Sequence, residues 1–266
     1  MSKKKNIWIS WMADEGPGFV PAMAVQELSI KGVETSGAEW NDDHERLAWT
    51  ELSEVLCKAD GPDAWLMVCD EEHFNKKSNR FALSLIAAQV KENRGYNFPI
   101  FLLALDFHPQ QENLPQMLSD IRLFSAAEEP QWASKLVAGL YRSKKIEAPD
   151  YRFSVRANPA FGLWLEFGPR SDTWKGVMAG VHGDNVQITH QAVGEPGVLP
   201  EKCTLEYPLE GMVAQVGDTE YQAWGVSNEL GSEHSYYIKV QGMPDKIIFG
   251  GHPGEDNAEV RVLNLQ

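Results

Sequence analysis

The sequence predicts two units of different fold class, an α/β unit followed by an all-β unit. Residues 1–150 contain long helical patterns between short apolar runs, which is typical of alternating helices and strands. Residues 151–266 contain short alternating runs separated by turn residues, and they hold 15 of the 22 glycines. A charged stretch that ends in Pro149-Asp150 separates the halves, so we expect domains at residues 1–148 and 149–266.

The first half is expected to contribute five strands, at residues 6–12, 33–38, 64–69, 99–105 and 120–124. The third strand (AWLMVC) and the fourth (PIFLLAL) are apolar throughout. Continuous apolar runs of this length favour strands that are buried on both faces of a parallel sheet.

Four helices are expected between and after these strands, at residues 19–31, 46–59, 80–93 and 129–142. In the first of them Val20, Ala24 and Leu28 lie four residues apart and share one face. Ser78 or Asn79 is expected to cap the third helix. Because parallel strands need crossover helices, the first half is predicted to be a doubly wound, parallel five-stranded sheet of flavodoxin-like order.

The second half is predicted to form an antiparallel β-sandwich or barrel. Gly183-Asp184 and Gly217-Asp218 fit tight hairpin turns. The expected strands lie at residues 151–157, 161–167, 173–181, 185–190, 202–207, 212–216, 219–226, 234–240, 246–249 and 259–265.

Three segments of the first half carry a resemblance to a known family. The opening strand NIWISW leads into a serine and an aromatic residue, the helix from Trp49 precedes the strand motif DAWLMV, and Ser78 is followed by the aromatic Phe81. In this order they resemble a TIR domain, the signalling domain of Toll and interleukin-receptor proteins and of many bacterial proteins. The resemblance covers about residues 5–143 and implies a flavodoxin-like fold that associates with itself or with a protein partner.

Some TIR domains cleave NAD with a glutamate that lies four residues beyond an aromatic residue, on the helix after the third strand. With Phe81 placed on that aromatic residue, Leu85 stands where the glutamate is expected. Residues 80–90 contain no carboxylate, and Glu92 lies near the end of the helix. The family glutamate is therefore not found, so no cofactor is expected, and NAD is the alternative that the resemblance implies.

Ligands of open α/β sheets bind beyond the carboxyl ends of the strands. Acidic residues follow the first, third and fourth expected strands, so a ligand or Mg²⁺ site is one interpretation, and solvated acids at helix N-termini are the other. The ligand-binding candidates are Trp11, Asp14, Glu15, Asp70, Phe81 and Asp106. The catalytic candidates are Glu71, Glu72, His73 and Glu92, and the magnesium candidates are Asp14 and Asp70.

Two sets of aromatic residues have two interpretations each. Trp40 and Trp49 flank the acidic loop 41–45, where they either stack on a base or pack. The second half offers a stacking platform for sugar or peptide, unless its aromatic residues are core: Trp164, Trp174, Trp224, Tyr236 and Tyr237. Cys57 and Cys69 are expected to be inert core thiols.

Charge and composition limit the classes of function that we expect for the chain. The net charge is −14, shared equally between the halves, which argues against direct nucleic-acid binding. No run approaches the ~18 apolar residues of a membrane span, and the three cysteines have no paired spacing, so a cytoplasmic protein is expected. We predict a signalling or interaction protein with a protein partner or a homo-oligomeric state. The alternatives are an NAD or nucleotide hydrolase acting at the strand ends and a carbohydrate- or peptide-binding β domain.

Overall fold

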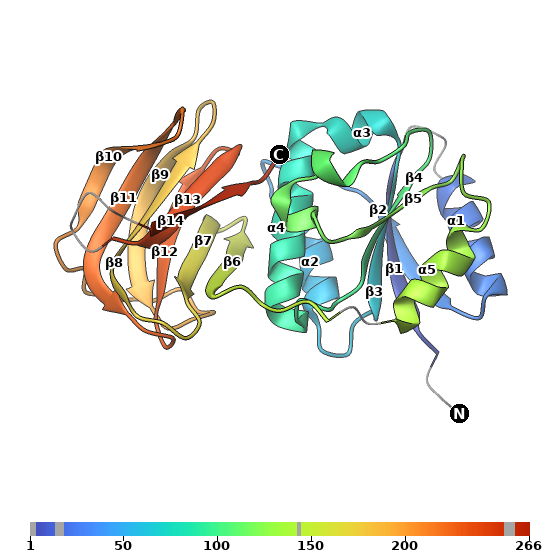
Figure 1. The fold of residues 1–266 in the computed structure, drawn as a ribbon, viewed down its shortest axis with the longest axis horizontal. Helices are drawn as coiled ribbons and strands as arrows, with labels where there is room; N and C mark the ends of the chain where they lie inside the picture. The colour runs from blue at the N-terminus through green and yellow to red at the C-terminus, as the bar shows by residue number, and fades with distance from the viewer. Residues whose placement is uncertain (1–3, 14–18, 143–144, 253–258) are drawn as a thin grey trace. The chain divides into compact units, whose positions relative to one another are not determined.

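The chain forms two compact units, Met1–Glu147 and Ala148–Gln266 (Figure 1). The structure is a computed structural model, and it describes residues 4–13, 19–142, 145–252 and 259–266. The expected order of an α/β unit followed by a β-rich unit is confirmed.

The first unit is built on a parallel sheet with the strand order β2-β1-β3-β4-β5, as the flavodoxin-like prediction requires. β1 lies inside the sheet, so that Ile9 pairs with Gly37 on one side and with Leu66 on the other. The strands are β1 (Asn6–Met12), β2 (Glu34–Glu39), β3 (Ala64–Cys69), β4 (Ile100–Ala104) and β5 (Arg122–Ser125).

Helices cover both faces of this sheet (Figure 1). Ile7 and Ile9 of β1 point to one face and pack with Leu28 and Leu136 of two helices, α1 and α5. Two other helices, α2 and α4, pack together on the opposite face. The helices are α1 (Phe19–Ile30), α2 (Trp49–Cys57), α3 (Glu71–Asn75), α4 (Lys77–Arg94) and α5 (Trp132–Tyr141), with 3-10 turns η1 (Gln111–Asn113) and η2 (Gln116–Leu118).

The expected capping of the third helix is wrong. Residues 71–75 form a separate short helix, α3, so the chain enters α4 already at Lys77, and its N-cap Lys76 makes no side-chain capping hydrogen bond. Asn79 therefore lies inside the first turn of α4, where it is fully buried. The predicted start of α2 at residue 46 is also too early, because a turn with Leu47 at φ 52° precedes Trp49.

The second unit is a sandwich of two antiparallel sheets, with the orders β6-β7-β12-β9 and β10-β11-β8-β13-β14. Between the sheets Phe249 stacks on Phe167, with ring centroids 4.6 Å apart, and Phe153 stacks on both. The strands are β6 (Tyr151–Asn158), β7 (Gly162–Pro169), β8 (Trp174–His182), β9 (Gln187–Gly194), β10 (Leu209–Val216), β11 (Thr219–Leu230), β12 (Ser235–Gln241), β13 (Lys246–Gly251) and β14 (Glu259–Asn264).

Two predictions for this unit are wrong. Residues 202–207 form no strand but belong to the connection from β9 to β10, residues 195–208, in which Pro196, Pro200 and Pro208 lack the N–H that a sheet requires. Gly183-Asp184 forms no hairpin because β8 and β9 belong to different sheets. The hairpin at Gly217-Asp218 is confirmed, with Val216 paired to Thr219.

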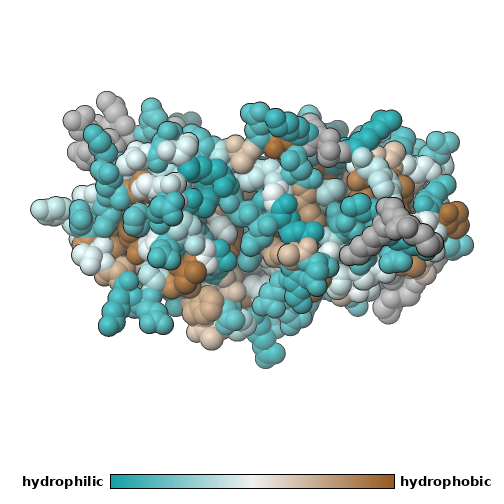
Figure 2. Space-filling view, turned by 90° about the horizontal axis from the view of Figure 1, so that it is seen from below, coloured by the Kyte–Doolittle hydropathy of each residue, from teal (hydrophilic) through white to brown (hydrophobic). Residues whose placement is uncertain are grey.

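Hydrophilic residues dominate the face seen in Figure 2, and hydrophobic residues form small separate patches on it. Among the described helices, none is both long enough and apolar enough to cross a membrane.

Candidate functional site

The α/β unit contains a cavity of about 190 Å³ between α2, the middle of β1 and the carboxyl end of β2. Trp8 of β1, Trp40 of the β2–α2 connection and Trp49 of α2 contribute to its wall, and we call it the indole cavity. The other lining residues are Ser10, Ala38, Glu39, Asn41, Ala48, Glu51, Leu52 and Val55.

The sequence of β2 explains why the space is open. β2 reads ETSGAE, so it offers no large apolar side chain to fill the gap beneath α2. Leu52 and Val55 of α2 remain half-buried at the cavity, whereas Leu56, one position further along, is fully buried. The cavity therefore results from a helix that covers an edge strand without large side chains.

Buried and part-buried hydrogen bonds hold the wall in place. Trp40 Nε1 donates to Asn79 Oδ1 over 2.9 Å, and Asn79 Nδ2 donates to the carbonyl of His73 over 2.8 Å. Trp65 Nε1 donates to Oγ of the cavity residue Ser10 over 3.1 Å. Trp8 Nε1 is buried and has no hydrogen-bond partner within the described part of the chain.

The size and charge of the cavity limit what it can hold. A dry cavity of about 150 Å³ can hold a benzene molecule, so the indole cavity suits a single flat ring. Indole faces attract cations. Glu39 and Glu51 line the opening, and Asp42, Asp43 and Glu45 lie on the adjacent loop, so a neutral or positively charged ring is favoured over an anion.

We expect Asn79→Ala to lower the free energy of unfolding by about 2 kcal/mol, because it removes the acceptor of the part-buried Trp40 N–H and one of the two donors to the His73 carbonyl. Urea unfolding followed by circular dichroism measures the loss. Asn75→Ala, at an exposed position of α3, is the control and should change stability by less than about 0.5 kcal/mol. Equal stability of the two variants would contradict this function of Asn79.

The acidic residues after β3 and β4 lie together, but they serve helix capping. Asp70 is the N-cap of α3, and its Oδ1 accepts from His73 N and contacts His73 Nδ1, each over 2.8 Å. Asp106 Oδ1 accepts from Glu71 N over 2.9 Å. The side chains of Glu71 and Glu72 are exposed on the first turn of α3.

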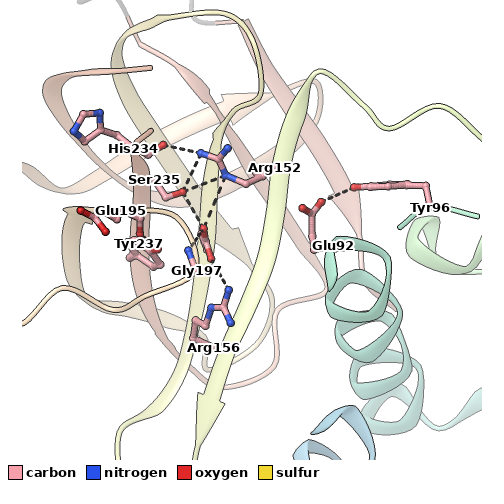
Figure 3. Close-up of polar contacts among 10 residues, drawn as sticks. Glu92, Tyr96, Arg152, Arg156, Glu195, Gly197, His234, Ser235 and Tyr237 are labelled. Carbon is pink, nitrogen blue, oxygen red and sulfur yellow. Dashed lines mark hydrogen bonds and ion pairs between the residues drawn. The ribbon is translucent and has the colours of Figure 1, made fainter. Parts of the chain in front are cut away.

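The remaining predicted site residues are dispersed. Trp11 packs against the α1 and α5 side of the sheet, opposite Trp8, and Phe81 is a core residue that is 2% exposed. Glu92 accepts a hydrogen bond from Tyr96 at the far end of α4 (Figure 3). Asp14 and Glu15 lie outside the described residues.

None of the described candidates lines the indole cavity, and no group of three or more potential metal ligands occurs among the described residues. Burial, together with the charges of Asp70 and Asp106, raises the pKa of the Cys69 thiol well above its usual value, so this thiol stays protonated at neutral pH.

The sequence did indicate part of the cavity. The sequence places Trp40 and Trp49 on either side of the acidic loop 41–45, and both residues line the cavity. Trp8 was missed, although the two-residue periodicity of β1 places it on the same face as Ser10 and on the opposite face from Trp11.

The β unit contains a buried charged cluster (Figure 3). Glu166 of β7 is 1% exposed, and its Oε1 accepts from Ser235 Oγ and from Gly197 N, each over 2.9 Å. Arg156 Nη2 lies 3.4 Å from Oε2, and Arg152 Nε lies 4.0 Å from Oε1. Since Gly197 belongs to the 195–208 connection, Glu166 fastens this connection to the sheet.

The aromatic residues of the β unit do not form one platform. Tyr236 and Tyr237 are fully buried, and Tyr237 donates to the carbonyl of Glu195 over 2.5 Å. Trp164 belongs to one sheet, whereas Trp174 and Trp224 belong to the other.

No protein-family model matches the chain, and no curated protein matches its sequence.

Proposed function

We propose that the α/β unit is a recognition module that binds one flat, neutral or positively charged heteroaromatic ring in the indole cavity. The observation that carries this proposal is the cavity itself, about 190 Å³ in volume and lined by Trp8, Trp40 and Trp49.

The nicotinamide ring of NAD is the ring we favour. It is flat, so it can stack on the indole faces. Its positive charge is attracted by the indole rings and by the carboxylates of Glu39 and Glu51. The acidic opening disfavours phosphate groups, so the ring rather than the rest of a nucleotide is expected to provide the affinity.

We propose further that the protein acts in the cytoplasm as a signalling or interaction protein, as the resemblance to TIR domains implies. The β unit would then have a recognition or regulatory role. The expected NAD hydrolase is the less supported alternative. None of its candidate residues lines the indole cavity: Glu71 and Glu72 are exposed on α3, His73 contacts Asp70, and Glu92 accepts from Tyr96.

Calorimetric titration with three pyridine derivatives of similar size and different charge tests the ring specificity. We expect 1-methylnicotinamide, a cation, to bind with a dissociation constant on the order of 100 μM, as is typical of ligands of about ten heavy atoms. Neutral nicotinamide should bind more weakly, and anionic nicotinate should not bind. Equal binding of all three rings, or tightest binding of nicotinate, would contradict the proposed site.

Leu52→Trp fills the cavity and is expected to weaken the binding of 1-methylnicotinamide at least about tenfold, because a larger half-buried side chain occupies the space of the ring. Trp11→Phe is the matched control, since Trp11 lies on the opposite face of the sheet and should leave the affinity unchanged. Release of nicotinamide from NAD by the wild-type protein would instead favour the hydrolase.

A further inference from the structure

The α/β unit contains a second cavity, at the end of the sheet where its parallel strands begin. It has a volume of about 80 Å³ and lies beside Ile100, the first residue of β4, and Arg122, the first residue of β5. We call it the amino-end cavity. The polar side chains among its described lining residues are Lys91, Asn97, Asp120, Arg122 and Arg142.

Positive charge exceeds negative charge at the amino-end cavity. Lys91, Arg122 and Arg142 are basic, and Asp120 is the only acidic residue among the described lining residues. Lys91 Nζ lies 2.5 Å from Asp120 Oδ1, so these two charges compensate each other. Arg122 and Arg142 form no ion pair with a carboxylate of the described residues. Two positive charges therefore remain uncompensated beside the cavity.

The guanidinium group of Arg122 is held against the end of α5. A Cβ atom at Gly139 would lie 2.1 Å from Arg122 Nη1, so a larger residue at this position would displace the group. Arg122 Nη2 donates to the backbone carbonyl of Arg142 over 3.1 Å, which brings both arginines to one end of the helix. A guanidinium group has five N–H donors, so this one bond leaves donors of Arg122 for a ligand.

We propose that the amino-end cavity binds a small tetrahedral oxyanion, such as phosphate or sulfate, beside the guanidinium groups of Arg122 and Arg142. Guanidinium groups bind such anions through paired, charge-assisted hydrogen bonds. The two uncompensated positive charges match the charge of a dianion. The volume excludes larger ligands, because a single benzene ring occupies a cavity of about 150 Å³.

The negative net charge of the chain acts only weakly on this cavity. The acidic residues that follow β3 and β4 lie at the carboxyl ends of these strands, whereas the cavity lies at the amino ends. β4 has five residues, so its two ends are about 16 Å apart. This separation is about twice the Debye length at physiological ionic strength. The charges that line the cavity therefore determine what it binds.

Calorimetric titration of the full chain with inorganic phosphate tests the proposal, with the ionic strength held constant by sodium chloride. We expect one site with a dissociation constant on the order of 1 mM, as a ligand of so few atoms allows. Sulfate, which is also a tetrahedral dianion, should bind within about threefold of phosphate, and the monoanion acetate should bind at least about tenfold more weakly.

Glycerol phosphate distinguishes the two sources of such an anion. If it binds more tightly than inorganic phosphate, the oxyanion belongs to a larger molecule that extends out of the cavity. If it binds more weakly, the ligand is the free ion. Either order supports the oxyanion site.

Two arginine variants and a matched control test the location of the site. Arg142→Gln removes one guanidinium group but keeps the carbonyl that Arg122 binds, so the end of α5 stays capped. It should weaken phosphate binding about tenfold, and Arg122→Gln should weaken it at least as much. Arg46→Gln is the control, because it removes the same charge from an 85% exposed side chain beyond the carboxyl end of β2 and should leave the affinity unchanged.

Backbone amide signals in a two-dimensional NMR spectrum provide a second measurement. Phosphate is expected to shift the signals of Ile121 and Gly139, which line the amino-end cavity, and to leave the indole N–H signals of Trp8, Trp40 and Trp49 unchanged.

An absence of phosphate binding up to about 20 mM, well above the expected dissociation constant, would overturn the proposal. Equal phosphate affinity in the wild-type protein and both arginine variants would also overturn it, because the ion would then bind elsewhere. Neither result depends on ring binding in the indole cavity, so the two proposals fail separately.

Discussion

Replacing Glu166 with alanine is expected to lower the free energy of unfolding of the β unit by about 3 kcal/mol. Breaking a buried ion pair by removing one partner costs about 3–5 kcal/mol, since the other charge stays uncompensated. Here the loss leaves Arg156 and Arg152 without their carboxylate, and Ser235 Oγ and Gly197 N without their acceptor. We take the lower end of that range because both arginines are partly exposed.

Urea unfolding followed by tryptophan fluorescence measures this loss, and it should affect the transition of the β unit more than that of the α/β unit. Glu166→Gln keeps an acceptor for Ser235 and Gly197 and should cost less than alanine. Glu128→Gln is the control, because the ion pair of Glu128 with His108 is exposed, and such pairs contribute about 0–1 kcal/mol. If Glu166→Ala lowers the free energy of unfolding by less than Glu128→Gln does, Glu166 does not hold the 195–208 connection on the sheet.

The β unit is also expected to lose stability at alkaline pH. Burial, with the nearby charge of Glu166, raises the pKa of Tyr237 to about 12, against 10.0 for an ordinary tyrosine. Burial also raises the pKa of Tyr236, whose hydroxyl donates to Gln191 Oε1. Between pH 10 and 12 the unfolded chain loses the Tyr237 proton while the folded chain keeps it, so stability falls as the pH rises.

This titration has no effect below pH 10, and by pH 12 it lowers the free energy of unfolding by up to about 3 kcal/mol, since the pKa differs by about two units and one unit corresponds to 1.36 kcal/mol. Urea unfolding at several pH values measures it. Tyr237→Phe should reduce the slope of stability against pH, although it costs about 1 kcal/mol at neutral pH through the lost bond to Glu195. Tyr207→Phe, at an exposed position, should leave the slope unchanged; an unchanged slope in Tyr237→Phe would contradict the raised pKa.

The fold of the α/β unit could be predicted because its central strands are apolar on both faces. β3 and β4 are continuous runs of buried residues, as is typical of strands that helices cover on both faces of a parallel sheet. The structure confirms the strand order that this interpretation suggested. The start of α4 was placed wrongly because Asn79, a common capping residue, instead bonds Trp40 and His73 from within the helix.

The candidate site could be predicted only in part. Acidic residues follow β3 and β4, as the sequence predicts. However, the side chains of Asp70 and Asp106 accept hydrogen bonds from backbone N–H groups of α3. The indole cavity depends on what is missing from β2, a large side chain under α2, and local sequence patterns do not report such gaps. Glu166 stands between buried Leu165 and Phe167, and its partners lie up to 69 residues away in the sequence.

The claim that a ring binds among Trp8, Trp40 and Trp49 is tested most directly by the indole N–H signals in a two-dimensional NMR spectrum. The chain has nine tryptophans. Titration with 1-methylnicotinamide is expected to shift the signals of these three and to leave those of Trp11, Trp164 and Trp174 unchanged. Shifts confined to the tryptophans of the β unit, or no shift at a ligand concentration of about 1 mM, tenfold above the expected dissociation constant, would contradict the account.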